Sequence, residues 1–66
     1  MIEIVDIKVY DENNYLVTTF KTLKEYEWYV DNSSDILLEY TYPEFNVKIN
    51  NELETMTPEE YYEIAI

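Results

Sequence analysis

The first twenty residues alternate between apolar and polar side chains in a way that predicts a β-hairpin. In residues 2–10, IEIVDIKVY, the apolar side chains change from even to odd positions: Ile2 and Ile4, then Val5, Ile7 and Val9. Neighbouring residues of a strand face opposite sides of a sheet, so this change predicts a β-bulge near Val5 and Asp6. DENN at 11–14 predicts the turn, with asparagine at positive-φ positions because the chain has no glycine. YLVTTF at 15–20 is rich in β-branched and aromatic residues and predicts the second strand.

Two later segments carry the start signals of helices. In TLKE, Thr22 stands three residues before Glu25, which is the spacing of a capping box. The helix that follows is expected to end around residues 31–32, before two serines. TPEE at 57–60 repeats the signal, with a threonine as N-cap and a proline at the first helical position. The second helix has barely two turns, so it must pack on the rest of the protein to persist.

The middle of the chain predicts further strands. DILLEYTY at 35–42 alternates, which would place Ile36, Leu38, Tyr40 and Tyr42 on one face of a third strand that Pro43 bends or ends. FNVKI at 45–49 predicts a fourth strand, two asparagines can turn it, and residues 52–54 can pair back. The order β-β-α-β-β-α predicts an α+β fold with a mostly antiparallel sheet and a central helix, in a single domain over residues 1–66.

Size and composition restrict how the domain is stabilised and where it acts. A chain of 66 residues buries only about 60% of the surface that it exposes when unfolded. It has no cysteine for a disulfide, and with no histidine either it offers no zinc site. We therefore expect a homodimer to supply the missing burial. No apolar run approaches the roughly 20 residues of a membrane span and no signal peptide is visible, so we expect a cytoplasmic protein.

Charge changes the picture most. Fifteen acidic residues stand against four lysines and no arginine, for a net charge of −11. This excess disfavours direct binding to nucleic acid or to an anionic membrane and favours a basic protein as the partner. Between Glu25 and Val47 there are six acidic residues and no basic one. Spread evenly, the charge would be about one per 400 Å², against very roughly 100 Å² for duplex DNA, so only a segregated or dimeric arrangement approaches the density of DNA.

The residue types present make catalysis improbable on chemical grounds. Without histidine, cysteine, arginine or a glycine-rich loop, the chain has no candidate for a catalytic triad, metal-assisted hydrolysis or phosphate binding. Carboxylate pairs could in principle cleave glycosides, but fifteen acids guarantee chance pairs. DENN carries oxygen ligands suited to calcium, yet it lacks the glycine and the later glutamate of an EF-hand loop. We expect a protein that is not an enzyme and needs no cofactor.

The first helix supplies the candidate partner-binding residues. On a helical wheel, Leu23, Tyr26 and Val30 form a stripe that faces the sheet, with Tyr29 at its margin. Trp28 lies on the opposite side, where it is either an anchor for a partner or covered by the second helix or a dimer mate. We therefore expect the partner-binding surface to comprise acidic and aromatic residues of the central segment: Glu25, Tyr26, Glu27, Trp28, Tyr29, Asp31, Asp35 and Glu39.

These segments together resemble a known family. IKVYDENNYLVTTFK followed by LKEYEWYVDNSSDILLEYTY resembles the small dimeric phage proteins that inhibit uracil-DNA glycosylase. The shared pattern is a strand, an acidic turn, a strand, a helix that opens on Leu23-Lys24-Glu25-Tyr26-Glu27, a link that ends in Asp35, and an aliphatic strand at 36–38. The match covers about two thirds of the chain, and residues 43–66 have no counterpart.

The resemblance implies a mechanism of DNA mimicry. An inhibitor of this family offers carboxylates where the enzyme grips DNA phosphates, and an aromatic-lined pocket for the side chain that the enzyme pushes into the duplex. The family's key helix aromatic, usually phenylalanine, falls on Tyr26, and its neighbouring acid falls on Glu27, whereas a later aromatic is Val30 here. Two alternatives stay open: an anti-CRISPR or anti-restriction DNA mimic, and an interaction or assembly subunit whose acidity serves only solubility.

Overall fold

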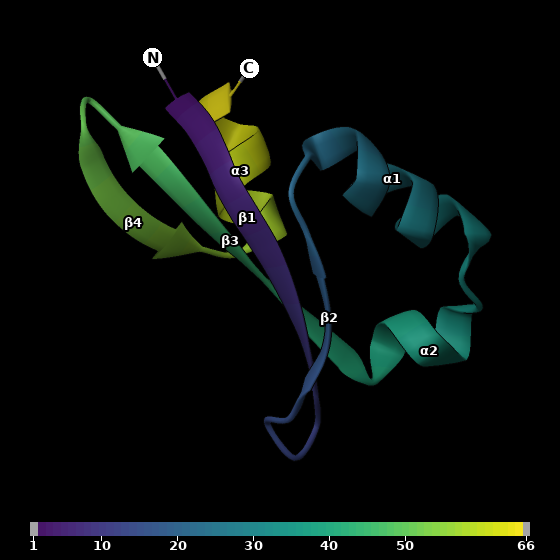
Figure 1. Ribbon diagram of the computed structural model, residues 1–66. Helices are drawn as coiled ribbons and strands as arrows, with labels where there is room; N and C mark the ends of the chain where they lie inside the picture. Colours follow the sequence, from purple (N-terminus) through teal and green to yellow (C-terminus); the bar gives the residue numbers. More distant parts are fainter. Residues whose placement is uncertain (1, 66) are drawn as a thin grey trace.

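A computed structural model describes residues 2–65 and shows four strands and three helices. The strands form one antiparallel sheet in the order β2-β1-β3-β4, so β2 and β4 are its edges (Figure 1). The predicted α+β class and β-β-α-β-β-α order are confirmed, with one additional short helix after the first. In chain order the elements are β1 (Ile2–Asp11), β2 (Leu16–Phe20), α1 (Leu23–Asn32), α2 (Asp35–Glu39), β3 (Thr41–Ile49), β4 (Glu52–Met56) and α3 (Pro58–Ala65).

The predicted bulge in β1 is confirmed and explains the change of parity in the sequence. Ile4 pairs with Val47 and Asp6 with Asn46, so Val5 is the extra residue on the β1 side. The bulge lets apolar residues on both sides of it pack against the same core, which holds Ile2, Ile4 and Ile7. Without the additional residue, half of β1 would turn its apolar side chains away from the core.

Residues 35–42 were expected to be a strand, and this prediction is wrong for their first part. The backbone N–H of Leu37 donates to Ser34 Oγ at 3.2 Å, and α2 follows this N-cap. Apolar residues two apart, Ile36 and Leu38, suggested a strand, but capping and the i→i+4 bonds of one helical turn prevail over so short an alternation. The strand begins only at Thr41, whose hydroxyl donates to the Leu37 carbonyl at 2.8 Å and joins α2 to β3.

Pro43 is expected from the sequence to bend or end a strand, and it does not end one. It lies inside β3, opposite Val9 of β1. The pairing of β3 with β4 begins only at Phe45, so at Pro43 the other side of β3 has no neighbouring strand. A proline is tolerated where the missing N–H faces such an edge. The predicted strand at 45–49 is therefore the second half of a longer strand.

Asparagine forms the tight turns of this glycine-free chain, as predicted. Asn50 and Asn51 have φ values of 51° and 71° and connect β3 to β4 in a two-residue hairpin. Two positive φ values are what a type I′ hairpin turn requires. In the first hairpin Asn14 has φ 66°, and Asp11 Oδ1 accepts from the backbone N–H groups of Asn13 and Tyr15, both at 2.9 Å. The turn therefore gives the Asp11 carboxylate its hydrogen-bond donors.

The core lies between one face of the sheet and the two longer helices. Phe45 is fully buried, and its ring centroid lies 5.1 Å from those of Tyr26 in α1 and Tyr61 in α3. Both helices therefore pack on the same face and meet over β3. The opposite face bears a polar ladder, in which Asn46 bonds Asp6 and Thr55, each at 2.7 Å. None of the helices within residues 2–65 is long and apolar enough to cross a bilayer.

Candidate functional site

The first helix is positioned by the predicted capping box. The backbone N–H of Glu25 donates to Thr22 Oγ1, and the N–H of Thr22 donates to Glu25 Oε1, both at 3.2 Å. The Thr22 hydroxyl also donates to the same carboxylate oxygen at 3.0 Å. Glu25, one of the predicted partner-binding residues, therefore has a structural task at the start of α1. Its charge still adds to the field of the helix.

The two tyrosines of α1 belong largely to the core, as the wheel predicted. Tyr26 is 8% exposed, and its ring meets that of Phe45 edge-on. Tyr29 stacks at a tilt on Phe20, with ring centroids 5.2 Å apart. The Tyr29 hydroxyl is buried and has no hydrogen-bond partner among the described residues. An unpaired buried hydroxyl costs stability, because its hydration is lost without replacement.

This unpaired hydroxyl leads to a prediction about stability. Replacing Tyr29 by phenylalanine should raise the free energy of unfolding by about 1 kcal/mol, which is roughly 4–8 °C in melting temperature for a domain of this size. The matched control is Tyr62→Phe, which removes a hydroxyl that does have a partner, at Glu27 Oε2. That variant should be slightly destabilised or unchanged. Thermal unfolding followed by circular dichroism tests both, and a clear loss of stability in Tyr29→Phe would contradict the prediction.

Trp28 lies on the solvent side of α1, as predicted, and is 67% exposed. It borders a shallow apolar depression together with Phe20, Thr22, Lys24 and Glu25. Its backbone carbonyl accepts from the Asn32 side chain at 2.8 Å, which fixes the end of the helix and leaves the indole untouched. Neither α2 nor α3 borders this depression. A large exposed aromatic of this kind is typical of a protein-binding surface.

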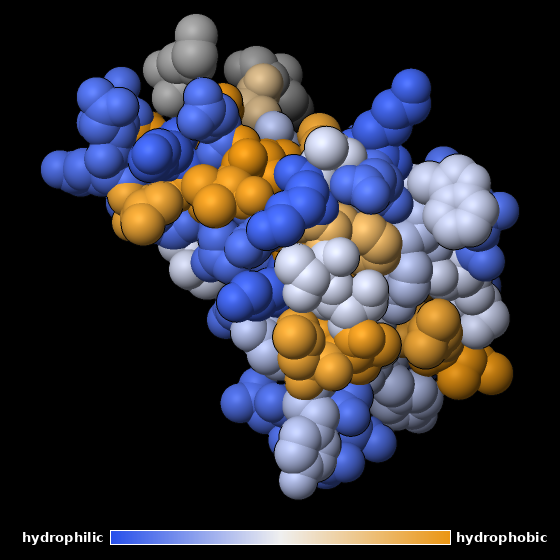
Figure 2. Space-filling model, viewed as in Figure 1, coloured by the Kyte–Doolittle hydropathy of each residue, from blue (hydrophilic) through white to orange (hydrophobic). Residues whose placement is uncertain are grey.

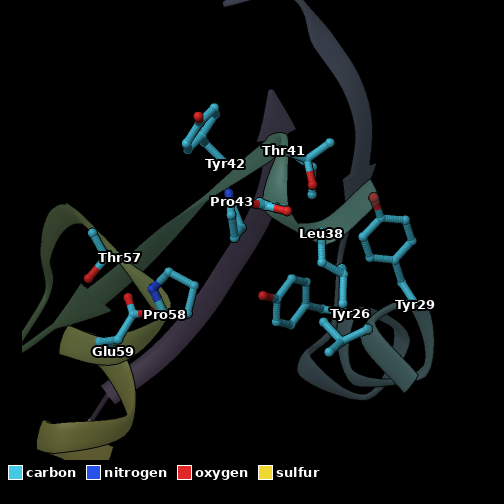
Figure 3. A pocket seen from close by; sticks show the side chains of 12 residues that line it. Tyr26, Tyr29, Leu38, Thr41, Tyr42, Pro43, Thr57, Pro58 and Glu59 are labelled. Carbon is cyan, nitrogen blue, oxygen red and sulfur yellow. The ribbon is translucent and has the colours of Figure 1, made fainter. Parts of the chain in front are cut away.

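One hollow lies where α1, α2, β3 and α3 meet, and we call it the tyrosine hollow. It has a volume of about 470 Å³ (Figure 3). Apolar residues form most of its wall, and Glu39 and Glu59 are its two acidic lining residues. The Tyr26 hydroxyl points into the space toward the start of α3, whereas the Tyr42 ring turns away from it. The full lining is Val9, Tyr26, Tyr29, Val30, Leu38, Glu39, Thr41, Tyr42, Pro43, Thr57, Pro58 and Glu59.

A second hollow of about 460 Å³, the acidic hollow, opens beside α1. Its lining consists of Tyr26, Glu27, Val30, Asp31 and Tyr62, so it shares Tyr26 and Val30 with the tyrosine hollow. The Tyr62 hydroxyl of α3 donates a hydrogen bond to Glu27 Oε2 at 3.2 Å, and this bond connects α3 to α1. Burial, followed by the nearby Glu27 carboxylate, raises the pKa of Tyr62 to about 12, so this hydroxyl stays protonated at neutral pH.

Negative charge is concentrated on the helices. They carry eight carboxylates and a single lysine, Lys24: Glu25, Glu27, Asp31, Asp35, Glu39, Glu59, Glu60 and Glu63. The three carboxylates of α1 lie along roughly 15 Å of helix, or about one per 5 Å, against one phosphate per roughly 3.4 Å in a DNA strand. Over the whole surface of 4997 Å² the net charge is sparser, about one per 450 Å². The helices thus carry eight of the fifteen acidic residues and one of the four lysines.

The structure brings most of the sequence-predicted residues around the two hollows. Tyr26, Tyr29 and Glu39 line the tyrosine hollow, and Glu27 and Asp31 join Tyr26 at the acidic hollow. Glu25 and Trp28 occupy the neighbouring side of α1, and Asp35 opens α2 without lining any of these depressions.

Sequence reasoning missed the contribution of α3, which supplies Glu59 and Tyr62. The signal was present, because EEYY repeats the acid-aromatic pattern of EYEWY.

The described residues contain no cluster of metal ligands. Within residues 2–65, no three acidic side chains come close enough together to hold a metal ion. Comparison of the chain with protein-family models, with curated proteins and with solved structures found no match. The function of the site is therefore inferred from its own residues.

Proposed function

We propose that this protein is an acidic inhibitor that imitates DNA and occupies the DNA-binding groove of a basic protein, with uracil-DNA glycosylase as the favoured target. The observation that carries the proposal is the set of helices, which bear eight carboxylates and one lysine, with four of these carboxylate residues bordering two tyrosine-lined hollows. Carboxylates on this layer take the place of phosphates, and the hollows accept a side chain of the target. Such a protein performs no chemistry and binds neither nucleic acid nor membrane.

Electrostatics and packing have separate tasks in this mechanism. Net charge of −11 accelerates the encounter with a basic groove, and salt screens this effect over a Debye length of about 8 Å at physiological ionic strength. The exposed indole of Trp28 and the apolar walls of the hollows then pack against the target, and water is released from these surfaces on binding. In this mechanism acidic and aromatic residues are adjacent on α1 because the same surface must both attract the basic groove and pack against it.

The choice of target is supported by the resemblance of residues 4–42 to the phage inhibitors of uracil-DNA glycosylase. In that pattern Tyr26 occupies the place of the key helix aromatic and Glu27 that of the neighbouring acid. The position of Tyr26 between the two hollows is compatible with this role. A protein of this kind acts in the cytoplasm of a phage-infected host cell.

The proposal is tested by uracil excision from a labelled oligonucleotide. A stoichiometric excess of this protein should abolish excision at low salt, with weaker inhibition as ionic strength rises. Full glycosylase activity in the presence of excess protein would exclude this target. Retention of another basic DNA-binding protein, such as a CRISPR or restriction nuclease, would then identify a mimic with a different target. Salt-independent association would instead indicate an assembly subunit.

We also expect the protein to form a homodimer in solution. The sheet is covered on one face only, and Leu16, Tyr42 and Leu53 are 55%, 55% and 70% exposed. On the side seen in Figure 2, hydrophobic side chains gather over β3 and β4 and again over β2 and α2. Open sheet edges and exposed apolar groups both favour self-association. Sedimentation equilibrium should give twice the monomer mass of 8.0 kDa, and only monomer at micromolar concentration would refute the dimer.

A further inference from the structure

We propose that the tyrosine hollow binds an arginine side chain of the protein partner. The identity of the partner rests on the function proposed above, but the chemistry of its anchoring residue is inferred from the hollow alone. The inference replaces an apolar anchor, which the family resemblance implies, with a cationic one.

The wall of the hollow suits the aliphatic part of such a side chain. Val9, Val30 and Leu38 line it together with the two prolines of the chain. Val9 is 1% exposed, so this part of the wall lies deep between sheet and helices. The methylene groups of an arginine can pack along such a surface while the charged head remains at polar groups.

The polar groups of the hollow are acceptors suited to a cation. Glu39 ends α2 and Glu59 lies in the first turn of α3, and no lysine is among the lining residues. The Tyr26 hydroxyl points toward the Glu59 side of the hollow (Figure 3). Burial raises the pKa of Tyr26, and the negative charge of the Glu59 carboxylate raises it further. The Tyr26 hydroxyl therefore stays protonated and lies in the electric field of that carboxylate.

An apolar anchor would satisfy this site poorly. A leucine seated in the hollow would remove water from the Tyr26 hydroxyl and from nearby carboxylate oxygens without offering them a donor, which is unfavourable. A guanidinium offers five N–H donors in a planar array, pairs with carboxylates in a bidentate manner and stacks on aromatic rings. Lysine offers a compact, more strongly hydrated charge, so arginine fits a mixed tyrosine and carboxylate lining better.

The experiment is an NMR titration of the full-length protein with three single-residue probes. N-acetyl-arginine amide should shift the methyl signals of Val9, Val30 and Leu38 and the ring signals of Tyr26, with a dissociation constant on the order of 10 mM. N-acetyl-citrulline amide, which has the same shape without charge, and N-acetyl-leucine amide should bind at least about fivefold more weakly. Equal or tighter binding of the leucine probe at these signals would overturn the inference, as would no response to the arginine probe.

Paired variants locate the binding site. The double substitution Glu39→Gln and Glu59→Gln should weaken binding of the arginine probe by about tenfold. The control, Glu52→Gln with Glu54→Gln, removes the same charge from exposed positions of β4 and should leave binding nearly unchanged. Equal losses in both double variants would show general charge attraction and overturn the site. No glycosylase is present in these titrations, so their outcome is independent of whether inhibition is observed.

Discussion

Replacing Tyr61 by alanine should lower the free energy of unfolding by about 3 kcal/mol, a large fraction of the stability of so small a domain. Tyr61 is 9% exposed and lies 5.1 Å, centroid to centroid, from Phe45 at the centre of the core. Removing its ring leaves a void beneath α3 and takes away the main contact of that helix with β3. An isolated helix of eight residues has no stability of its own, so α3 should unfold with the change.

Urea denaturation followed by circular dichroism measures this effect, and Ile64→Ala is the matched control. Ile64 lies in the same helix but is 53% exposed, so its truncation should cost well under 1 kcal/mol. Deletion of residues 57–66 should be at least as damaging as Tyr61→Ala. If the Tyr61 variant and the truncated chain both unfold at the same urea concentration as the unmodified protein, α3 does not pack on the sheet. The residues at the start of α3 would then not line the tyrosine hollow.

The second large effect concerns binding to the target. Trp28→Ala should speed dissociation from the glycosylase by about thirtyfold, because a buried aromatic anchor typically contributes 2 kcal/mol or more. Glu27→Gln should mainly slow association, since it removes a charge while its amide oxygen can still accept the hydrogen bond from Tyr62. Tyr26 is unsuitable for this test, because its ring is part of the core.

Surface plasmon resonance at two salt concentrations separates the two rate constants. The controls are Tyr15→Ala, an exposed aromatic of the first hairpin, and Glu12→Gln, an acid of the same turn. Both should bind like the unmodified protein at physiological salt. If Trp28→Ala dissociates no faster than Tyr15→Ala, the binding surface lies elsewhere on the molecule.

Short-range signals explain why much of the fold was predictable. The capping boxes at Thr22 and Thr57 and the Asn50–Asn51 turn each depend on residues no more than a few positions apart. Their physical causes, hydrogen bonds to helix ends and the steric limits of positive φ, act within one turn of chain. These features therefore appear in the structure where the sequence predicts them.

The wrong predictions, at residues 35–39 and at Pro43, concern local patterns that are compatible with two different structures. Ile36 and Leu38 are compatible with a strand or with one turn of helix, and Ser34 as N-cap tips the balance toward helix. Pro43 disfavours a central strand, but it is tolerated because β4 is too short to reach it. The extent of β4 is a property of the assembled sheet, so residues around Pro43 do not reveal it.

By itself the sequence determines the charge of the protein and the face of α1 that packs inward, because each follows from residue identities and helical periodicity. Only the tertiary structure decides which of the fifteen acids act together. Glu27 meets Tyr62 although 35 positions separate them, and Glu39 and Glu59 line one hollow although they belong to different helices. The physical reason is that α1 and α3 both pack on Phe45, which brings Glu27 to Tyr62, and that α2 and α3 both contact β3, which brings Glu39 and Glu59 to one hollow.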